Sequence, residues 1–292
     1  MTLRFSFAVS LFLLAMSTGT AQAQALQAGQ PPGNEWLFAV NDRGELLRFK
    51  AGNPRAILSR KKIGGLNEDV RGIDFRVSHG VLFVLGASGR LYTLDTATAQ
   101  ATAVGETPLA LPAVETGFDF NPTVDRIRVA LADGTNLRAH PVTGAQVDSD
   151  PKADGVQRDG PLAYAPGDPH AGWPALVNGV AYTYNPKNDK LTTNFAIDGA
   201  RGTLVTMGSR EGVEPAVSPN SGQVFTVGSL KTGPVTAVSF DISDAHNSAY
   251  LAASRVGDSR THLFRVNLDT GEAAYLASIG KKERIRGLAI EP

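Results

Sequence analysis

Three aspartates recur at one position of a repeated phrase, and they are the residues best placed for chemistry. Asp74, Asp119 and Asp241 each lie between two apolar residues, as in Ile73-Asp74-Phe75. Side chains alternate along a strand, so the aspartates share one face and the apolar neighbours pack on the other. If the repeats surround a common axis, the three carboxylates gather near it.

Gathered carboxylates support two interpretations. Like charges raise one another's pKa or recruit a cation, typically calcium, which prefers oxygen ligands. The alternative is structural: each aspartate accepts hydrogen bonds from backbone N–H groups of its own or a neighbouring repeat. The sequence leaves calcium as the one cofactor to test.

Basic and amide side chains accompany the same strands. Arg71 and Arg286 are equivalent in two repeats, and Asn121, Arg126 and Arg128 follow the second aspartate. Arginine forks can bind a carboxylate or phosphate, so Arg71, Asn121, Arg126 and Arg286 are candidate ligand-binding residues. They could equally pair with the aspartates.

Other catalytic chemistries find no support. The five histidines have no zinc-ligand spacing, the chain has no cysteine, and no G-x-S-x-G motif is present. No acid/base pair or nucleophile can therefore be named, and the catalytic residues, if any, are unknown.

The phrase around the aspartates comes back along the chain and predicts a repeat architecture. Its copies are Arg71–Arg76, Thr116–Pro122, a degenerate Pro161–Pro166, Val238–Ser243 and Arg286–Pro292. In the degenerate and last copies the aspartate position holds Ala163 and Ala289.

Short apolar runs separated by turns follow each phrase, and no segment has a sustained helical period. After the first phrase they are 81–85, 90–94 and 101–104; after the second, 126–131, 136–140 and 145–147; after the fourth, 249–252, 262–266 and 273–277. Four short strands per repeat predict an all-β fold, a β-propeller of four-stranded blades.

The spacing of the phrases favours five blades. Their glycine positions are 72, 117, 161, 239 and 287, so the steps are 45, 44, 78 and 48 residues. The long step predicts an extra hairpin on the fourth blade, within residues 203–232. Six blades is the alternative.

The two ends of the chain predict how the ring closes. Ile285 to Glu291 is a first strand with no later strands, whereas Trp36 onwards supplies later strands with no first strand. Joined, they complete one blade and remove the open sheet edges of an unclosed ring.

The N-terminus predicts export. Residues 1–25 resemble a signal peptide, with Arg4, an apolar run from Phe5 to Met16 and two Ala-x-Ala sites. Residues 26–34 are a polar linker, and residues 35–292 form one propeller domain. We expect a periplasmic or extracellular protein, without a lipid-attachment cysteine and without a membrane span after cleavage.

The charge balance argues against nucleic acid as a partner. Lys plus Arg and Asp plus Glu number 28 each, so no net field attracts a polyanion. We expect a monomer that meets a small molecule, a glycan or a protein.

The phrases VRGIDFR, TGFDFNPTVDRIRVALADGTNLRAHPVTGA, VSFDIS and IRGLAIEP resemble the bacterial domain-of-unknown-function 4394 family. The resemblance covers residues 35–292 and is most specific over residues 116–146. It implies an exported β-propeller and no particular activity. The segment between Lys187 and Leu230 departs from the family pattern, which leaves any function located there open.

Two functions remain. The favoured one is a non-catalytic binding or scaffold module that uses the propeller mouth. The alternative is a glycosidase-like or lactonase-like hydrolase that uses axial carboxylates, with or without calcium, by analogy of fold.

Overall fold

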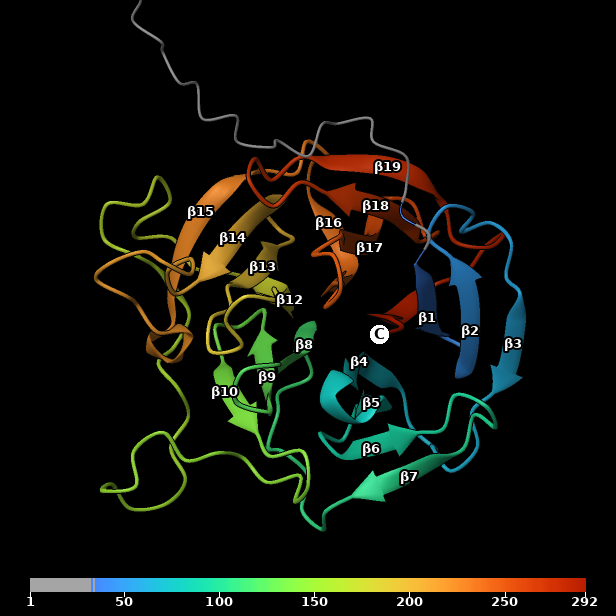
Figure 1. Cartoon of the computed structure of the whole chain (residues 1–292), viewed down its shortest axis with the longest axis horizontal. Coiled ribbons are helices and arrows are strands. Elements are labelled where there is room, and N and C mark those ends of the chain that lie inside the picture. The colour runs from blue at the N-terminus through green and yellow to red at the C-terminus, as the bar shows by residue number, and fades with distance from the viewer. Residues whose placement is uncertain (1–32, 34) are drawn as a thin grey trace, which may run out of the picture.

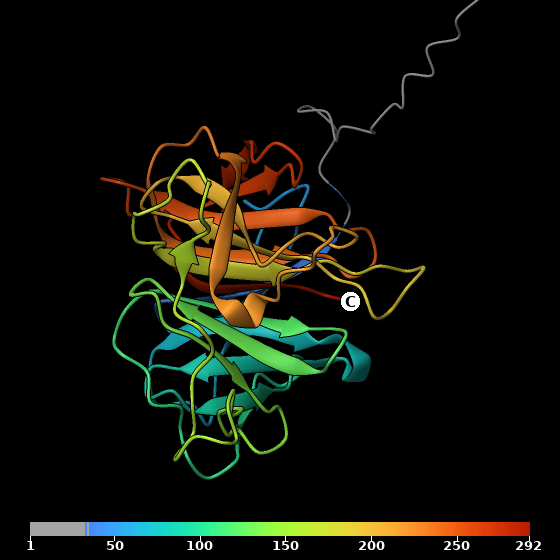
Figure 2. The ribbon, with the colours of Figure 1, turned by 90° about the vertical axis from the view of Figure 1, so that its left-hand side faces the viewer.

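Four of the five repeated phrases form inner strands of β-sheets that surround a common axis (Figures 1 and 2). The computed structural model describes residue 33 and residues 35–292, so the predicted signal peptide and nearly all of the linker lie outside the described residues. Five sheets radiate from the axis, which confirms a five-bladed β-propeller. No helix in the described residues is both long and apolar enough to cross a membrane.

The inner strands are the part of each blade that faces the axis. They are β20 (Ile285–Ile290) of blade one, β4 (Val70–Arg76) of blade two, β8 (Thr116–Asn121) of blade three, β12 (Val177–Tyr182) of blade four and β16 (Val235–Ile242) of blade five. Each contacts the inner strands of its two neighbours, so the ring is closed.

Glycine allows these strands to approach one another. A Cβ on Gly72 would lie 2.6 Å from the Phe118 Cβ, and one on Gly287 would lie 2.9 Å from the Ile73 Cγ1. A larger residue would therefore force the inner strands apart.

The remaining strands extend each blade outward, by antiparallel pairing except for one short outer strand of blade four. Blade one adds β1 (Trp36–Asn41), β2 (Glu45–Lys50) and β3 (Ser59–Lys62); blade two adds β5 (Val81–Gly86), β6 (Leu91–Leu94) and β7 (Ala101–Val104); blade three adds β9 (Arg126–Leu131) and β10 (Asn136–Ala139); blade four adds β13 (Asn194–Asp198), β14 (Thr203–Met207), β15 (Gln223–Ser229) and β11 (Ala163–Tyr164); blade five adds β17 (Ala249–Arg255), β18 (His262–Val266) and β19 (Ala273–Ser278). Two short 3₁₀ helices are present in the described chain, η1 (Val77–His79) and η2 (Pro219–Ser221).

The sequence prediction for blade four was wrong in one respect. The degenerate phrase Pro161–Pro166 does not form its inner strand; its residues 163–164 form β11, an outer strand that pairs in parallel with β15. The inner strand is β12, where Gly179 and Ala181 take the positions expected for residues 161 and 163.

The position of β12 as the inner strand also explains the step of 78 residues between the third and fourth phrases. β14 and β15 lie within the expected insertion, but they are the regular third and fourth strands of blade four and not an extra hairpin. The additional length lies instead in the segment between β10 and β12. Blade three has only three strands, because residues 145–147 contribute a single isolated bridge, Ala139 to Gln146.

The expected closure of the ring is confirmed. β20 pairs antiparallel with β1, with Leu37 opposite Ile290 and Ala39 opposite Leu288. Ionic contacts reinforce this pairing: Glu283, just before β20, accepts hydrogen bonds from Arg43 and Arg60 at 2.6 Å each and from Asn41 at 2.9 Å. We call this group of four residues, together with Glu45, the clasp.

The core lies between the blades. Five apolar clusters each fill the space between two neighbouring sheets. Phe75 of blade two, for example, packs with Phe38 of blade one at a ring-centroid distance of 5.8 Å. This packing directs the opposite side chains of the inner strands, including the aspartates, towards the axis.

Candidate functional site

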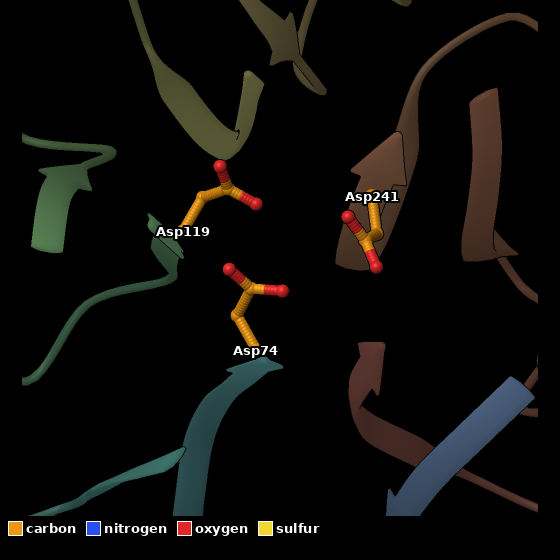
Figure 3. Close-up of side chains that lie close together, drawn as sticks. All are labelled: Asp74, Asp119 and Asp241. Atoms are coloured by element: carbon orange, nitrogen blue, oxygen red, sulfur yellow. The ribbon is translucent and has the colours of Figure 1, made fainter. Parts of the chain in front are cut away.

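The three repeat-equivalent aspartates meet on the axis (Figure 3). Asp74 extends from β4, Asp119 from β8 and Asp241 from β16, and one carboxylate oxygen of each lies within 4.8 Å of those of the other two. Their exposed fractions are 6%, 3% and 5%, so the cluster is buried. The sequence predicted this convergence from alternation and repetition alone.

Each aspartate binds the next blade around the ring. The Oδ2 atoms of Asp74, Asp119 and Asp241 accept hydrogen bonds from the backbone amides of Phe120 (2.7 Å), Tyr182 (2.9 Å) and Ile290 (2.6 Å). The structural role foreseen from the sequence is therefore present.

The same carboxylates also serve their own strands. Asp241 Oδ1 accepts a hydrogen bond from the amide of Ile242 at 2.6 Å, and Asp74 accepts one from the amide of Phe75. Five equivalent amides line the free inner edges of the five blades: Phe75, Phe120, Tyr182, Ile242 and Ile290. Three carboxylates thus satisfy five edge amides, which is why two alanines suffice at the remaining positions.

The electrostatics of the cluster are unfavourable to three negative charges. Burial raises the pKa of Asp74 well above its usual range, and Asp241 raises it further. Burial also raises the pKa of Asp119, followed by repulsion from Asp74 and Asp241. Burial raises the pKa of Asp241 to about 8. Within residues 35–292, none of the three forms an ion pair with a basic side chain, so the cluster holds protons at neutral pH or needs a cation.

A cavity of about 440 Å³ opens above the aspartates, at the end of the axis where the inner strands finish. Tyr182, Tyr184 and Phe120 contribute to its walls, and the carboxylates form its floor. Asp244 adds a fourth carboxyl, and burial raises its pKa to about 6. The combination is an aromatic-walled cavity with an acidic floor, which we call the axial cavity.

One basic side chain lines the axial cavity, and its charge is already matched. Arg76 donates hydrogen bonds to both carboxylate oxygens of Asp125, with Nε at 2.8 Å. This pair fixes the rim of the cavity and leaves the floor acidic.

The donor set fits a divalent cation. Calcium binds oxygen atoms at about 2.3–2.6 Å, so two of its ligands lie at most about 5 Å apart. The three aspartate oxygens satisfy that limit. Three protein oxygens are fewer than the six to eight that calcium takes, and water or a ligand would supply the others.

The four candidate ligand-binding residues do not form one site. Asn121 lines the axial cavity, where its Oδ1 accepts hydrogen bonds within its own turn from Thr123. Arg126 lines a second cavity, which Asn121 lines as well. Arg71 lies at the opposite, glycine-lined end of the axis, and Arg286 is exposed. The structure therefore brings Asn121 and Arg126 to one cavity and leaves Arg71 and Arg286 away from it.

Sequence reasoning missed the residues of the walls. Tyr184 and Asp244 lie in loops that follow inner strands, where the repeats differ in length and residue type. Arg76 could have been found, because it lies two residues after Asp74 and alternation places both on one face.

Comparison with known families agrees with this architecture. A family model described as "Domain of unknown function (DUF4394)" matches residues 45–289. The chain belongs to this family. No curated protein matches the chain.

Solved structures provide similar folds at low identity. An auxiliary nutrient binding protein from Bacteroides thetaiotaomicron is 10% identical with a TM-score of 0.42, over 84% of this chain and 57% of that one. Glutaminyl cyclase from Myxococcus xanthus is 12% identical with a TM-score of 0.46, over 74% of this chain and 81% of that one. A chain of a nidogen/laminin complex is 12% identical with a TM-score of 0.45, over 89% and 99%. Likenesses at this level carry no argument about function.

Proposed function

We propose that this propeller is a non-catalytic binding module and that its ligand occupies the axial cavity. The observation that carries the proposal is the acidic floor, three buried carboxylates facing one cavity without a basic partner in the described residues. Buried charge without a partner costs stability. A cationic ligand would remove that cost, because it supplies the charge that the protein does not.

Calcium is the first cation to test. The aspartates offer hard oxygen ligands at suitable separations, and the binding of calcium would drive the carboxyls to their ionised form. Binding should therefore release protons at neutral pH. An organic amine seated between Tyr182, Tyr184 and the carboxylates is the other cation with the required charge.

The experiment is a pair of titrations at pH 7 on protein freed of divalent ions with a chelator that is then removed. Calcium should raise the melting temperature, with a gain of about 2.7 kcal/mol at a hundredfold excess over the dissociation constant, and should release protons into a weakly buffered solution. Asp119→Asn should abolish both responses. Asp154→Asn, which removes an exposed aspartate far from the axis, is the matched control.

Two outcomes would count against calcium. A melting temperature that ignores calcium in the wild type would remove it as the ligand. If calcium still raises the melting temperature of Asp119→Asn, the calcium site lies away from the axis. In the first case, a screen of small amines by the same melts tests whether the axial cavity takes another cation.

A hydrolase is the second candidate, and one observation favours it. Asp241 and Asp244 line the axial cavity with pKa values raised to about 8 and about 6, so one carboxyl can hold a proton near neutral pH while another is ionised. General acid/base catalysis uses such a pair. Turnover of chromogenic glycosides or lactones that is lost in Asp244→Asn would support this alternative, and inactivity across such panels would leave the binding module.

We also propose that the protein acts outside the cytoplasm. The support is the positive residue, the apolar run and the small-residue cleavage sites within residues 1–25. Protein recovered from its native host should begin at Gln24 or Leu26. A mature chain that keeps Met1 would contradict export by this route.

A further inference from the structure

A second cavity, of about 400 Å³, lies between blades three and four, beside the axial cavity. Three arginines line it: Arg126 and Arg128 of β9 and Arg138 of β10. Strand geometry brings them together, since Arg126 and Arg128 are two residues apart and Arg138 is directly opposite Arg128. Tyr182 lines both cavities.

Arg128 occupies a position that is aromatic in every other blade. This position lies on the second strand, opposite the aspartate or alanine of the inner strand. Its occupants in blades one, two, four and five are Phe38, Phe83, Phe195 and Tyr250. Arg128 is as deeply buried as these aromatic residues, with an exposed fraction of 2%.

Stability alone does not explain this arginine. Arg128 Nη1 binds Asp159 Oδ2 at 2.5 Å, Nη2 binds Asn220 Oδ1 at 2.6 Å, and Nε binds the Tyr182 hydroxyl at 3.2 Å. The guanidinium is therefore satisfied. However, a buried ion pair is on balance no more stabilising than well-packed apolar side chains of similar volume. An aromatic residue at this position would present no guanidinium to the cavity.

The second cavity carries an excess of positive charge. In the part of the chain that the structure describes, Asp159 is the carboxylate paired with both Arg128 and Arg138. Arg126 forms no ion pair among those residues; its Nη1 donates to the main-chain oxygen of Asp125 at 2.8 Å, while the carboxylate of Asp125 binds Arg76. Three guanidinium groups thus line the cavity, and the one carboxylate that pairs with two of them, that of Asp159, does not line it.

We propose that this second cavity binds the oxyanion of a small molecule, a phosphate, sulfate or carboxylate group. Arg126 and Arg138 are half-buried and line it from the two strands, with Arg128 buried. Nε and Nη2 of Arg138 bind Asp159, so Arg138 offers the anion its Nη1 and Arg126 offers the guanidinium that has no carboxylate partner among the described residues. Guanidinium groups hold such anions by paired, charge-assisted hydrogen bonds. The site is distinct from the axial cavity and does not depend on the cation proposed there.

Calorimetric titration with inorganic phosphate, at constant ionic strength and with a chelator present, tests the proposal. The wild type should bind phosphate saturably. Arg126→Gln and Arg138→Gln should each weaken binding roughly tenfold or more, because each removes charge-assisted hydrogen bonds. Arg284→Gln, at an exposed arginine near the clasp, should leave the affinity unchanged. Circular dichroism verifies that each variant is folded.

Arg128→Phe provides an independent test of the phosphate site. It restores the aromatic residue that the other blades have, and Asp159 keeps Arg138 as its partner. This variant should stay folded and lose phosphate binding. Absence of saturable binding in the wild type, or equal affinity in wild type, Arg126→Gln and Arg128→Phe, would overturn the proposal. Because no divalent ion is present, these results do not depend on whether the axial cavity binds calcium.

Discussion

The carboxylates of the clasp and those of the axis lie in one ring of blades, yet their surroundings shift their pKa values in opposite directions. Burial alone would raise the pKa of Glu283, but hydrogen bonds from Arg60, Asn41 and Arg43 outweigh it and hold the pKa below its usual value. The axial aspartates have only backbone amides and one another, and their pKa values are raised. The clasp therefore gains stability from ionised carboxylates, whereas the axis loses stability when its carboxyls ionise.

This difference separates a structural group from a candidate functional one. Ionic contacts of the clasp join segments about 240 residues apart in the chain. The axial aspartates make the amide contacts that the ring needs but leave their charge unmatched. Unmatched buried charge beside a cavity is typical of binding and catalytic sites.

The largest expected effect comes from removing β20, which follows Glu283 of the clasp in the chain and supplies the Ile290 amide to the axis. Deleting residues 285–292 takes Ile285, Leu288 and Ile290 out of the core and removes the amide that binds Asp241. Three buried aliphatic residues at about 1.5–3 kcal/mol each are a large share of a stability of about 5–15 kcal/mol. The truncated protein should aggregate or melt far lower. A melting temperature within a degree or two of the full chain would refute closure by both termini.

The same chemical change should have opposite consequences in the two regions. Glu283→Gln removes the charge that Arg43 and Arg60 share, and we expect a loss of about 1–3 kcal/mol. Asp119→Asn removes an unmatched charge and keeps an oxygen for the amide of Tyr182, so stability at pH 8 should rise or change by less than about 1 kcal/mol. Urea unfolding of both variants measures the contrast.

Asp119→Ala is the control for that pair. It removes the charge and also the acceptor, so it should cost about 1–3 kcal/mol where Asp119→Asn does not. Equal losses in Glu283→Gln and Asp119→Asn would show that the axial charge is compensated after all.

The two regions should also respond to pH in different windows. The pKa of Asp241 is 3.8 in the unfolded chain and about 8 in the folded protein. The contribution of this carboxyl to stability is therefore fully present below pH 4 and is lost as the pH rises towards 8. For Glu283 and Glu45 the folded pKa lies below 4.5, so their contribution is present above that value and is lost as the pH falls. Melting temperatures from pH 3 to pH 9, without divalent ions, should decline at both ends.

Two variants show which carboxyl group causes the loss of stability at each end of the pH range. Asp241→Asn should flatten the loss between pH 5 and pH 8 and leave the acid loss in place. Glu283→Gln should do the reverse. A profile in which neither variant changes its own window would contradict the proposed origin of both.

The smallest effect is expected at the far end of the axis. Arg286→Gln changes an exposed residue and should alter stability by less than about 0.5 kcal/mol. It should also leave calcium and phosphate affinities at the wild-type values, because it lines neither cavity. A loss of either affinity would restore the idea of one shared site.

Repetition made the floor of the axial cavity predictable. The position of Asp74, Asp119 and Asp241 is marked by apolar neighbours on both sides in three blades, and strand alternation directs all three side chains to the axis. Blade four was misplaced because β12 has neither the aspartate nor the flanking phenylalanines, whereas the segment at residue 161 mimics the phrase through its proline.

The walls and the second cavity could not be predicted in the same way. Asp244 and Tyr184 take the position that Val77 and Pro122 have in blades two and three, and because the residue type at this position changes from blade to blade, no repeated pattern identifies them. Asp159 meets Arg128 across a long irregular segment, a contact that depends on how that segment folds back. The exception at Arg128 becomes visible only once the strand register shows that its counterparts are aromatic.

The hydrogen bonds of the axial aspartates all run to the next blade around the ring, and they join three of its five junctions. Asp74 joins blade two to three, Asp119 joins three to four, and Asp241 joins five to one. Ala181 and Ala289 make no such link, so none crosses from blade four to five or from one to two. A pair of hydrogen bonds at 2.9 Å between Tyr184 and Asn247 joins blades four and five beside the cavity instead. The floor of the axial cavity thus holds three junctions of the ring together, and its wall, through Tyr184, holds a fourth.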